Sequence, residues 1–353
     1  MQQPKTKMEK KIKKIEDLGE FGLIKHLTSD ISMKHQSTLK GPGDDAAVMD
    51  YKGKLVVATS DILMEGIHFN LIYTPMKHLG YKAVIANLSD IYAMNAIPKH
   101  IIVSVAFSSK LTLKQIENLY AGIRLACDNY DVDLAGGDTS TSVTGMAISI
   151  TAIGEGEKKR LVYRNGAKKN DLICVSGDLG AAYLGLQLLE REKKIFLENP
   201  EVQPELEGYD YLLQRQLKPE PRADIIDFFR KLNAQPSAMI DISDGLSSET
   251  LHICNESGVG CKLFADHIPV DPETEKLAAE FNITPLVAAL NGGEDYELLF
   301  TVSPGEYVKL KGNRNIRAIG HITDPDAGCN LVTHDGSFIP LQAKGWNAYG
   351  SNE

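Results

Sequence analysis

The chain has 353 residues, of which 43% are hydrophobic and 24% charged, so it is long enough for two domains with a buried core and too apolar to be disordered. Its 30 glycines follow no short repeat, which excludes a collagen-like chain. Acidic residues outnumber basic ones by 47 to 38, for a net charge of -9, and this balance argues against nucleic-acid binding. An acidic excess is also compatible with carboxylates that gather around cations.

The lysine-rich start of the chain, residues 1–14, is not followed by the apolar stretch of a signal peptide. No apolar run reaches the roughly 18 to 20 residues of a membrane span. The five cysteines are widely spaced and contain no C-x-x-C pair, so they predict neither a disulfide framework nor a zinc cluster: Cys127, Cys174, Cys254, Cys261 and Cys329. We therefore expect a cytoplasmic protein with no membrane segment.

Apolar periodicity predicts the elements of the first half in chain order. We expect helices over 17–28, 77–96 and 112–130, and strands over 54–58, 100–107, 132–135 and 146–153. Thr112 and Gln115 have the spacing of a capping box at the start of the third helix. The segment 154–169 is rich in glycine, lysine and arginine, which places a domain boundary near residue 158.

The second half repeats the mixture of strands and helices. Strands are expected over 172–175, 238–242 and 297–302, and helices over 181–190, 222–232 and 246–257. The charged segment 191–218 between them is expected to be an irregular, mobile excursion. Mixed elements in both halves predict two α+β or α/β domains, residues 1–158 and 159–353.

Aspartates recur in predicted loops just after short apolar strands: Asp44, Asp45, Asp61, Asp138, Asp241 and Asp244. Any one of them alone would be read as a turn former. Several converging carboxylates would repel one another unless cations lay between them, and Mg²⁺ prefers such oxygen ligands. Asp90 on the long helix, the hydroxyls of Thr59 and Ser60, and the flexible backbone of Gly136-Gly137 fit the same site. The repeated pattern favours shared metal and phosphate binding over unrelated turns.

The familiar nucleotide and nucleophile motifs are missing. No G-x-x-x-x-G-K-[ST], no strand leading into G-x-G-x-x-G, and no H-E-x-x-H or G-x-S-x-G is present. Four further residues are ambiguous when taken alone. His68 favours a packed or surface role and Trp346 an anchor for the C-terminal tail, whereas Glu294 and Arg164 could equally be solvated or contact a substrate.

The combined motifs resemble the thiamine-monophosphate kinase family over nearly the whole chain. The matching segments are G-D-D-A-A-V at 43–48, T-S-D at 59–61, G-I-H-F at 66–69, N-L-S-D-I at 87–91, A-G-G-D-T at 135–139, R-N-G-A at 164–167, D-I-S-D-G-L at 241–246 and G-G-E-D-Y-E-L at 292–298. The G-D-D and D-x-S-D-G pieces also occur in the wider aminoimidazole-ribonucleotide synthetase and selenophosphate synthetase superfamily. The N-L-S-D, G-G-D-T and G-G-E-D-Y-E-L pieces are more specific.

The resemblance implies an aminoimidazole-ribonucleotide-synthetase-like fold, a homodimer paired through the N-terminal domains, and ATP-dependent phosphorylation of thiamine monophosphate with several Mg²⁺ ions. The metal-binding positions of the family match Asp45, Thr59, Ser60, Asp61, Asp90, Asp138, Asp241 and Asp244. Its ATP contacts match Gly137, Asp138, Arg164 and Ser243, and its thiamine contacts match His68, Glu294 and Trp346. Asp61, Asp90 and Asp138 would be the catalytic carboxylates.

A phosphate acceptor is already ionised, so such a transfer needs charge neutralisation and alignment rather than a strong base or a covalent nucleophile. Two alternatives stay open. Another synthetase of the superfamily is one, although Cys127, inside a predicted helix, is the only cysteine of the first half and does not suit selenophosphate chemistry. A catalytically silent relative is the other, although such a protein should have lost some of the acidic oxygens.

Overall fold

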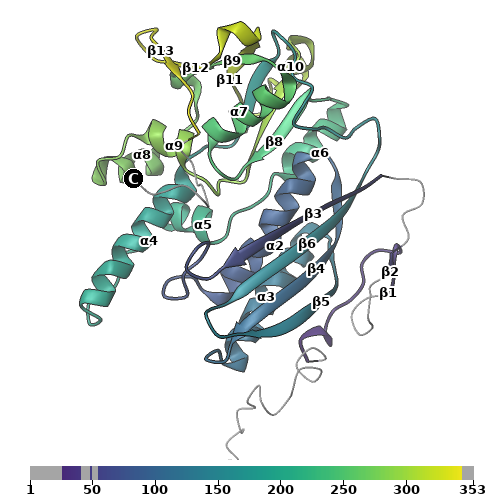
Figure 1. Ribbon diagram of the computed structural model, residues 1–353, viewed down its shortest axis with the longest axis vertical. Coiled ribbons are helices and arrows are strands. Elements are labelled where there is room, and N and C mark those ends of the chain that lie inside the picture. Colours follow the sequence, from purple (N-terminus) through teal and green to yellow (C-terminus); the bar gives the residue numbers. More distant parts are fainter. Residues whose placement is uncertain (1–25, 41–47, 50–54, 344–353) are drawn as a thin grey trace, which may run out of the picture.

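The computed structural model describes residues 26–40, 48–49 and 55–343, and these form two large β-sheets with helices packed on them and one small two-stranded sheet (Figure 1). The first sheet has the strand order β3-β6-β4-β5, with bounds Leu55–Met64, Ala147–Gly156, Ile97–Ser108 and Asp133–Ser142. Its β4–β5 pair is parallel and the other pairs are antiparallel. A separate two-stranded ladder joins β1 (Thr38–Lys40) and β2 (Val48–Met49).

Helices α2 (Met76–Ala93) and α3 (Leu113–Tyr130) cover one face of this sheet (Figure 1). They approach each other closely: a Cβ on Gly80 would lie 2.0 Å from the carbonyl oxygen of Leu119, and one on Gly122 would lie 1.9 Å from that of Lys77. The capping box of Thr112 and Gln115 is confirmed. Helix α2 is buried along most of its length, so the polar side chains that it carries are held rigidly.

The second sheet has the order β13-β12-β9-β11-β7-β10-β8, and its only parallel pair among the described strands is β9–β12. In chain order its strands are β7 (Leu172–Ser176), β8 (Ala238–Ile242), β9 (Gly260–Phe264), β10 (Glu297–Val302), β11 (Ile316–Thr323), β12 (Cys329–Val332) and β13 (Phe338–Pro340). The helices are α4 (Ala181–Glu198), α5 (Asp210–Leu217), α6 (Ala223–Leu232), α7 (Leu246–Ser257), α8 (Pro272–Glu280), α9 (Pro285–Asn291) and α10 (Pro304–Leu310), with short 3-10 turns at Ala265–His267 and Pro325–Ala327.

Alternate residues of the second sheet enter two different cores. Met239 and Phe300 join a core with α6, α10 and the first half of the chain, whereas Ile240 and Leu299 face the core that contains α7 and α9. The expected boundary near residue 158 lies in the connection between β6 and β7 and stays a prediction. None of the described helices combines the length and apolar character that would let it span a bilayer.

Three expectations about the elements were wrong. Strand β3 continues to Met64 and β5 to Ser142, so Asp61 and Asp138 lie within strands rather than in loops after them. Both strands stay paired beyond their polar residues, because tertiary hydrogen bonding overrides local composition. The segment 191–218 is not simply an irregular excursion, because α4 extends to Glu198 and α5 occupies Asp210–Leu217. Helix α2 ends at Ala93, before the expected residue 96.

Candidate metal and phosphate site

Strand β3 and helix α2 form the first part of a polar site. Thr59 and Asp61 face α2, because alternate side chains of a strand point to the same side of the sheet. The Thr59 hydroxyl donates a hydrogen bond of 2.7 Å to Asp90 Oδ2, and the backbone N–H of Asp61 donates one of 3.1 Å to Asn87 Oδ1. These two hydrogen bonds therefore hold the polar side chains of β3 and α2 in fixed positions relative to each other.

Strand β8 brings a third carboxylate to the same helix. Ser89, which precedes Asp90 on α2, donates a 2.8 Å hydrogen bond to Asp241 Oδ2. Burial, followed by the charge of Asp90, raises the pKa of Asp61 to about 6. Burial, followed by Asp90 and with a further contribution from Asp61, raises the pKa of Asp241 to about 7. Three carboxylates from distant segments thus repel one another in a poorly hydrated place.

Two more carboxylates lie at the start of α7. Burial is the main cause of the raised pKa of Asp244, and Glu294 adds to it while Arg164 opposes it. The backbone N–H of Asp244 donates a 3.0 Å hydrogen bond to Glu249 Oε1. Glu249 is 2% exposed, burial raises its pKa to about 8, and its Oε2 has no hydrogen-bond partner within the described structure. A buried carboxylate oxygen without a partner is the kind of atom that a cation would satisfy.

Arg164 is exposed, and its positive charge offsets part of the rise in pKa that burial causes at Asp90, Asp241 and Asp244. Arg164 therefore lies close enough to interact electrostatically with carboxylates of α2, β8 and the turn after β8. Its planar guanidinium suits a phosphate oxygen at the edge of this acidic site.

The turn that contains Glu294 is fixed against the turn that contains Ser243. The Glu294 N–H donates a 2.7 Å hydrogen bond to the Ser243 carbonyl, and Glu294 has a left-handed φ of 66°. Its carboxylate forms a 2.9 Å ion pair with Lys82 and accepts a 2.9 Å hydrogen bond from Gln216. Lys82 is 3% exposed and also donates to the Gln216 carbonyl, so this buried lysine of α2 orients Glu294. The cost of the strained backbone is consistent with a positioned functional group.

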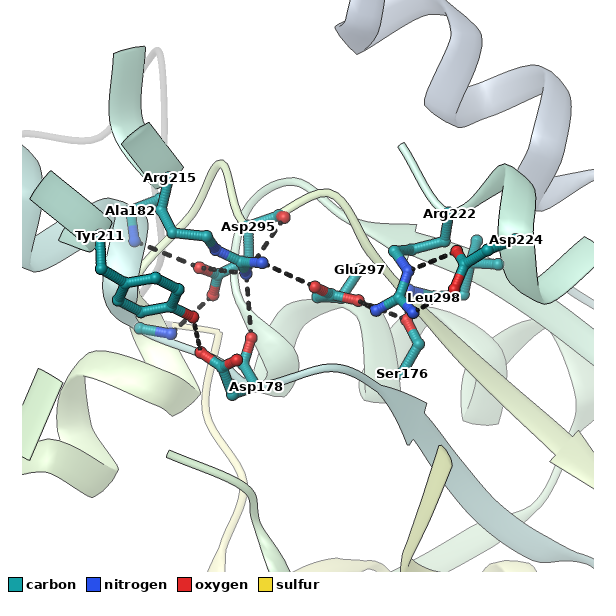
Figure 2. A network of polar contacts seen from close by, with 11 residues as sticks. Ser176, Asp178, Ala182, Tyr211, Arg215, Arg222, Asp224, Asp295, Glu297 and Leu298 are labelled. Carbon is teal, nitrogen blue, oxygen red and sulfur yellow. Dashed lines mark hydrogen bonds and ion pairs between the residues drawn. The ribbon is translucent and has the colours of Figure 1, made fainter. Parts of the chain in front are cut away.

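A second ionic network holds the segment that follows Glu294 (Figure 2). Glu297 of β10 accepts hydrogen bonds of 2.8 Å from Arg215 and 2.6 Å from Arg222, and a third from Ser176. Arg215 also donates to the carbonyl of Asp178, 3.0 Å away. The network joins α5 and the start of α6 to β7 and β10. It therefore fixes the position of Glu297, directly after the turn at 292–296.

Other predicted residues lie on the opposite face of the first sheet. Ser60 is exposed and accepts a 3.0 Å hydrogen bond from Thr151 of β6. Asp138 pairs in register with Ser104, and both are exposed on this outer face. Gly137 is packed so tightly that a Cβ there would lie 1.9 Å from the Val103 carbonyl oxygen. Within one chain, Ser60 and Asp138 therefore do not join Asp61 and Asp90.

His68 lies in the turn after β3, where its Nδ1 accepts a 3.0 Å hydrogen bond from the Met64 N–H. Asp45 and Trp346, expected at the metal and substrate positions, lie outside the described residues. Sequence reasoning did not single out Asn87 as a partner of Asp61, nor Lys82, Arg215, Arg222, Glu249 or Glu297. The motifs 87–91 and 292–298 contain Asn87 and Glu297. The others lie in helices, or for Arg222 at the N-cap of α6, and only the fold reveals their burial.

The donor set suits a hard divalent cation. It consists of carboxylate and hydroxyl oxygens, and among the described residues the acids do not form a group of three whose ligand atoms all lie within 4.8 Å of one another. Mg²⁺ tolerates such spacing because it keeps several waters and takes substrate phosphate oxygens as ligands. The arrangement can hold cations and a polyanion together, with Arg164 beside them.

Comparison with known proteins gives a consistent result. Residues 43–155 match the family described as "AIR synthase related protein, N-terminal domain". A curated "Thiamine-monophosphate kinase" from Bacillus subtilis is 34% identical over 341 residues, covering 94% of this chain and 100% of the relative. One from Aquifex aeolicus is 35% identical over 289 residues, covering 82% of this chain and 87% of the relative.

Comparison with solved structures points to the same family as the sequence comparison. The complex "AaThiL complexed with AMPPCP and TMP" has a TM-score of 0.72 at 31% identity and covers 97% of this chain and 100% of that chain. The thiamine-monophosphate kinase of Stenotrophomonas maltophilia has a TM-score of 0.73 at 30% identity, with coverage of 90% and 95%. Escherichia coli HypE, at 14% identity and a TM-score of 0.69, shows the shared fold alone.

Proposed function

Because this chain belongs to the thiamine-monophosphate kinase family, we propose that it transfers the γ-phosphoryl group of ATP directly to the phosphate of thiamine monophosphate, with Mg²⁺ at the acidic site. The observation that carries the proposal is the convergence of Thr59, Asp61, Asp90 and Asp241 from β3, α2 and β8. Burial and neighbouring carboxylates raise the pKa values of Asp61 and Asp241, and Arg164 offsets only part of the rise at Asp241.

The main barrier to this reaction is electrostatic, because two polyanions must meet. Each pair of unit charges about 4 Å apart costs ~4 kcal/mol at an effective dielectric constant of 20. Bound Mg²⁺ would neutralise that repulsion and polarise the phosphoryl oxygens. The carboxylates of Asp61, Asp90 and Asp241 would hold the cations, and Thr59 fixes the Asp90 carboxylate. The acceptor oxygen carries no proton at neutral pH, so no general base is required.

The remaining residues receive roles by position and by family likeness. Arg164 and Ser243 would contact ATP phosphates, together with Gly137 and Asp138. Glu294, oriented by Lys82, would contact thiamine monophosphate, as would His68 and Trp346. Asp45 and Asp244 would add further metal ligands. Ser60 and Asp138, which lie on the outer face of the sheet, could contribute only through a second copy of the chain.

We further propose that the enzyme works as a cytoplasmic homodimer. The outer face of the first sheet exposes apolar side chains of β3, including Val56 at 53%, Ile62 at 55% and Met64 at 39%. An exposed apolar face of this kind, with strand edges on both sides, is typical of an interface. A second copy of the chain would cover it.

The decisive test is an assay of the purified protein with ATP and Mg²⁺. We expect thiamine diphosphate from thiamine monophosphate, and no product from thiamine or from aminoimidazole precursors. Product from an aminoimidazole precursor would favour another synthetase of the superfamily, and no turnover with any acceptor would favour a silent relative. Covalent radiolabel trapped on the protein from γ-labelled ATP would contradict direct transfer.

A further inference from the structure

Three cysteines that are far apart in the sequence meet at one end of the second sheet. Cys254 lies in the last turn of α7, Cys261 in β9 and Cys329 at the start of β12. Their sulfur atoms all lie within 4.8 Å of one another. The cluster is at the opposite end of α7 from Asp244 and Glu249, so it is not part of the acidic site. The wide spacing of these cysteines in the sequence predicted no zinc cluster, but the fold brings the three thiols together.

The backbone fixes the three positions firmly. Gly258 ends α7 with a left-handed φ of 66°, which turns the chain directly into β9. Cys261 and Cys329 are direct partners in the parallel β9–β12 ladder, and the Cys261 N–H donates a 3.0 Å hydrogen bond to the Gly328 carbonyl. The three thiols therefore project from a helix and two paired strands rather than from loops.

The surroundings are apolar on one side and open on the other. Cys254 is 1% exposed and Cys261 is fully buried, and both belong to the core that contains Leu263 and Leu331. Cys329 is partly exposed. Cys329 is therefore the accessible end of the cluster.

We propose that Cys254, Cys261 and Cys329 form a binding site for one thiophilic cation of the Zn²⁺ type. Zinc–sulfur bonds are about 2.3 Å long, so three thiolates on one ion lie roughly 3.8–4.0 Å apart. The sulfur atoms, all within 4.8 Å of one another, exceed that spacing by less than about 1 Å. Each thiol that ligates the ion releases one proton. No other described His, Cys, Asp or Glu joins this group, so a water molecule on the Cys329 side takes the fourth position.

The test uses the full-length reduced protein in excess Mg²⁺, added to keep the probe ion from the proposed acidic site. Cd²⁺ serves as the spectroscopic probe, because thiolate-to-metal charge transfer produces ultraviolet absorption. We expect saturation at about one Cd²⁺ per chain, and weaker apparent Cd²⁺ affinity when a large excess of Zn²⁺ competes for the same thiolates. Replacing one ligand should weaken the affinity by at least about 10- to 100-fold.

Cys329→Ser is the preferred variant, because Cys329 is the partly exposed member and its replacement should leave the core folded. Cys127→Ser is the matched control, because Cys127 is a buried thiol of α3 outside the cluster. Circular dichroism checks the fold of both. Absorption that is absent from the parent protein, or unchanged in Cys329→Ser, would overturn the proposal. Recovery of a disulfide between two of these cysteines from the reduced, metal-treated protein would do so as well.

Discussion

At the scale of single residues, Asp241 is a carboxylate that suits cation binding but lowers the stability of the metal-free fold. Its carboxylate is buried beside Asp90 and Asp61, and its one described hydrogen bond comes from Ser89. A carboxylate whose pKa is raised in the folded protein is more easily protonated there than in the unfolded chain. In the absence of a cation, ionisation of such a group therefore destabilises the fold.

We expect Asp241→Asn to stabilise the metal-free protein and to abolish most turnover. Because the pKa of Asp241 is about 7 when folded, the parent should lose stability as the pH rises from 5 to 8, and the variant should lose less. The gain at pH 8 should be about 1 to 3 kcal/mol. Urea unfolding at both pH values, with and without Mg²⁺, measures it. Greater stability of the parent at pH 8 without metal would contradict the argument.

The ion pair between Lys82 and Glu294 supports a second prediction. Lys82→Met should leave Glu294 without its strongest partner and raise the KM for thiamine monophosphate more than it lowers kcat. A double-mutant cycle with Glu294→Gln should show a coupling of about 1 to 3 kcal/mol in unfolding free energy. Strictly additive effects would mean that Lys82 does not position this carboxylate.

At the scale of elements, the sequence predicted those features that interactions between neighbouring residues determine. The capping box at Thr112 and the span of α7 follow from sequence pattern alone. The extension of β3 to Met64 does not, because it depends on pairing with β6. The alternation of strand side chains could have separated Ser60 from Asp61 had that extension been known. The role of Arg215 could not be predicted from its charged segment, because its burial depends on partners in β10 and in the turn after β7.

Helix α5 is held to the second sheet through the side chain of Arg215. Arg215→Met would leave Glu297, which is 1% exposed, with less compensation, and should cost about 3 to 5 kcal/mol of unfolding free energy. Arg215→Lys should recover only part of this loss, because lysine lacks the planar fork. Urea unfolding measures both, and proteolysis within 199–222 should accelerate. Lys309→Ala, which removes an exposed ion pair with Glu306, is the control and should cost less than about 1 kcal/mol.

At the scale of the whole molecule, the first sheet keeps apart Asp61 and Asp138, which were predicted to bind the same metal ions. Asp61 faces α2 from edge strand β3, whereas Asp138 lies on the outer face of β5 at the other edge. Three strand spacings, roughly 14 Å, separate those edges, which is too far for one cation to be shared directly. A two-fold pairing of copies repeats every contact in both directions, so β3 of one copy and β5 of the other can complete a site together.

We therefore expect Asp61→Asn and Asp138→Asn to complement each other. Each variant alone should be nearly inactive, although both should fold. If the chain forms the proposed homodimer, co-expression makes half of the dimers mixed, and each mixed dimer holds one intact site. About a quarter of parental turnover should then return. Differently tagged chains and tandem purification isolate the mixed dimer, which should show about half. If Asp61 and Asp138 serve one site within a single chain, neither subunit of the mixed dimer is intact and no activity returns.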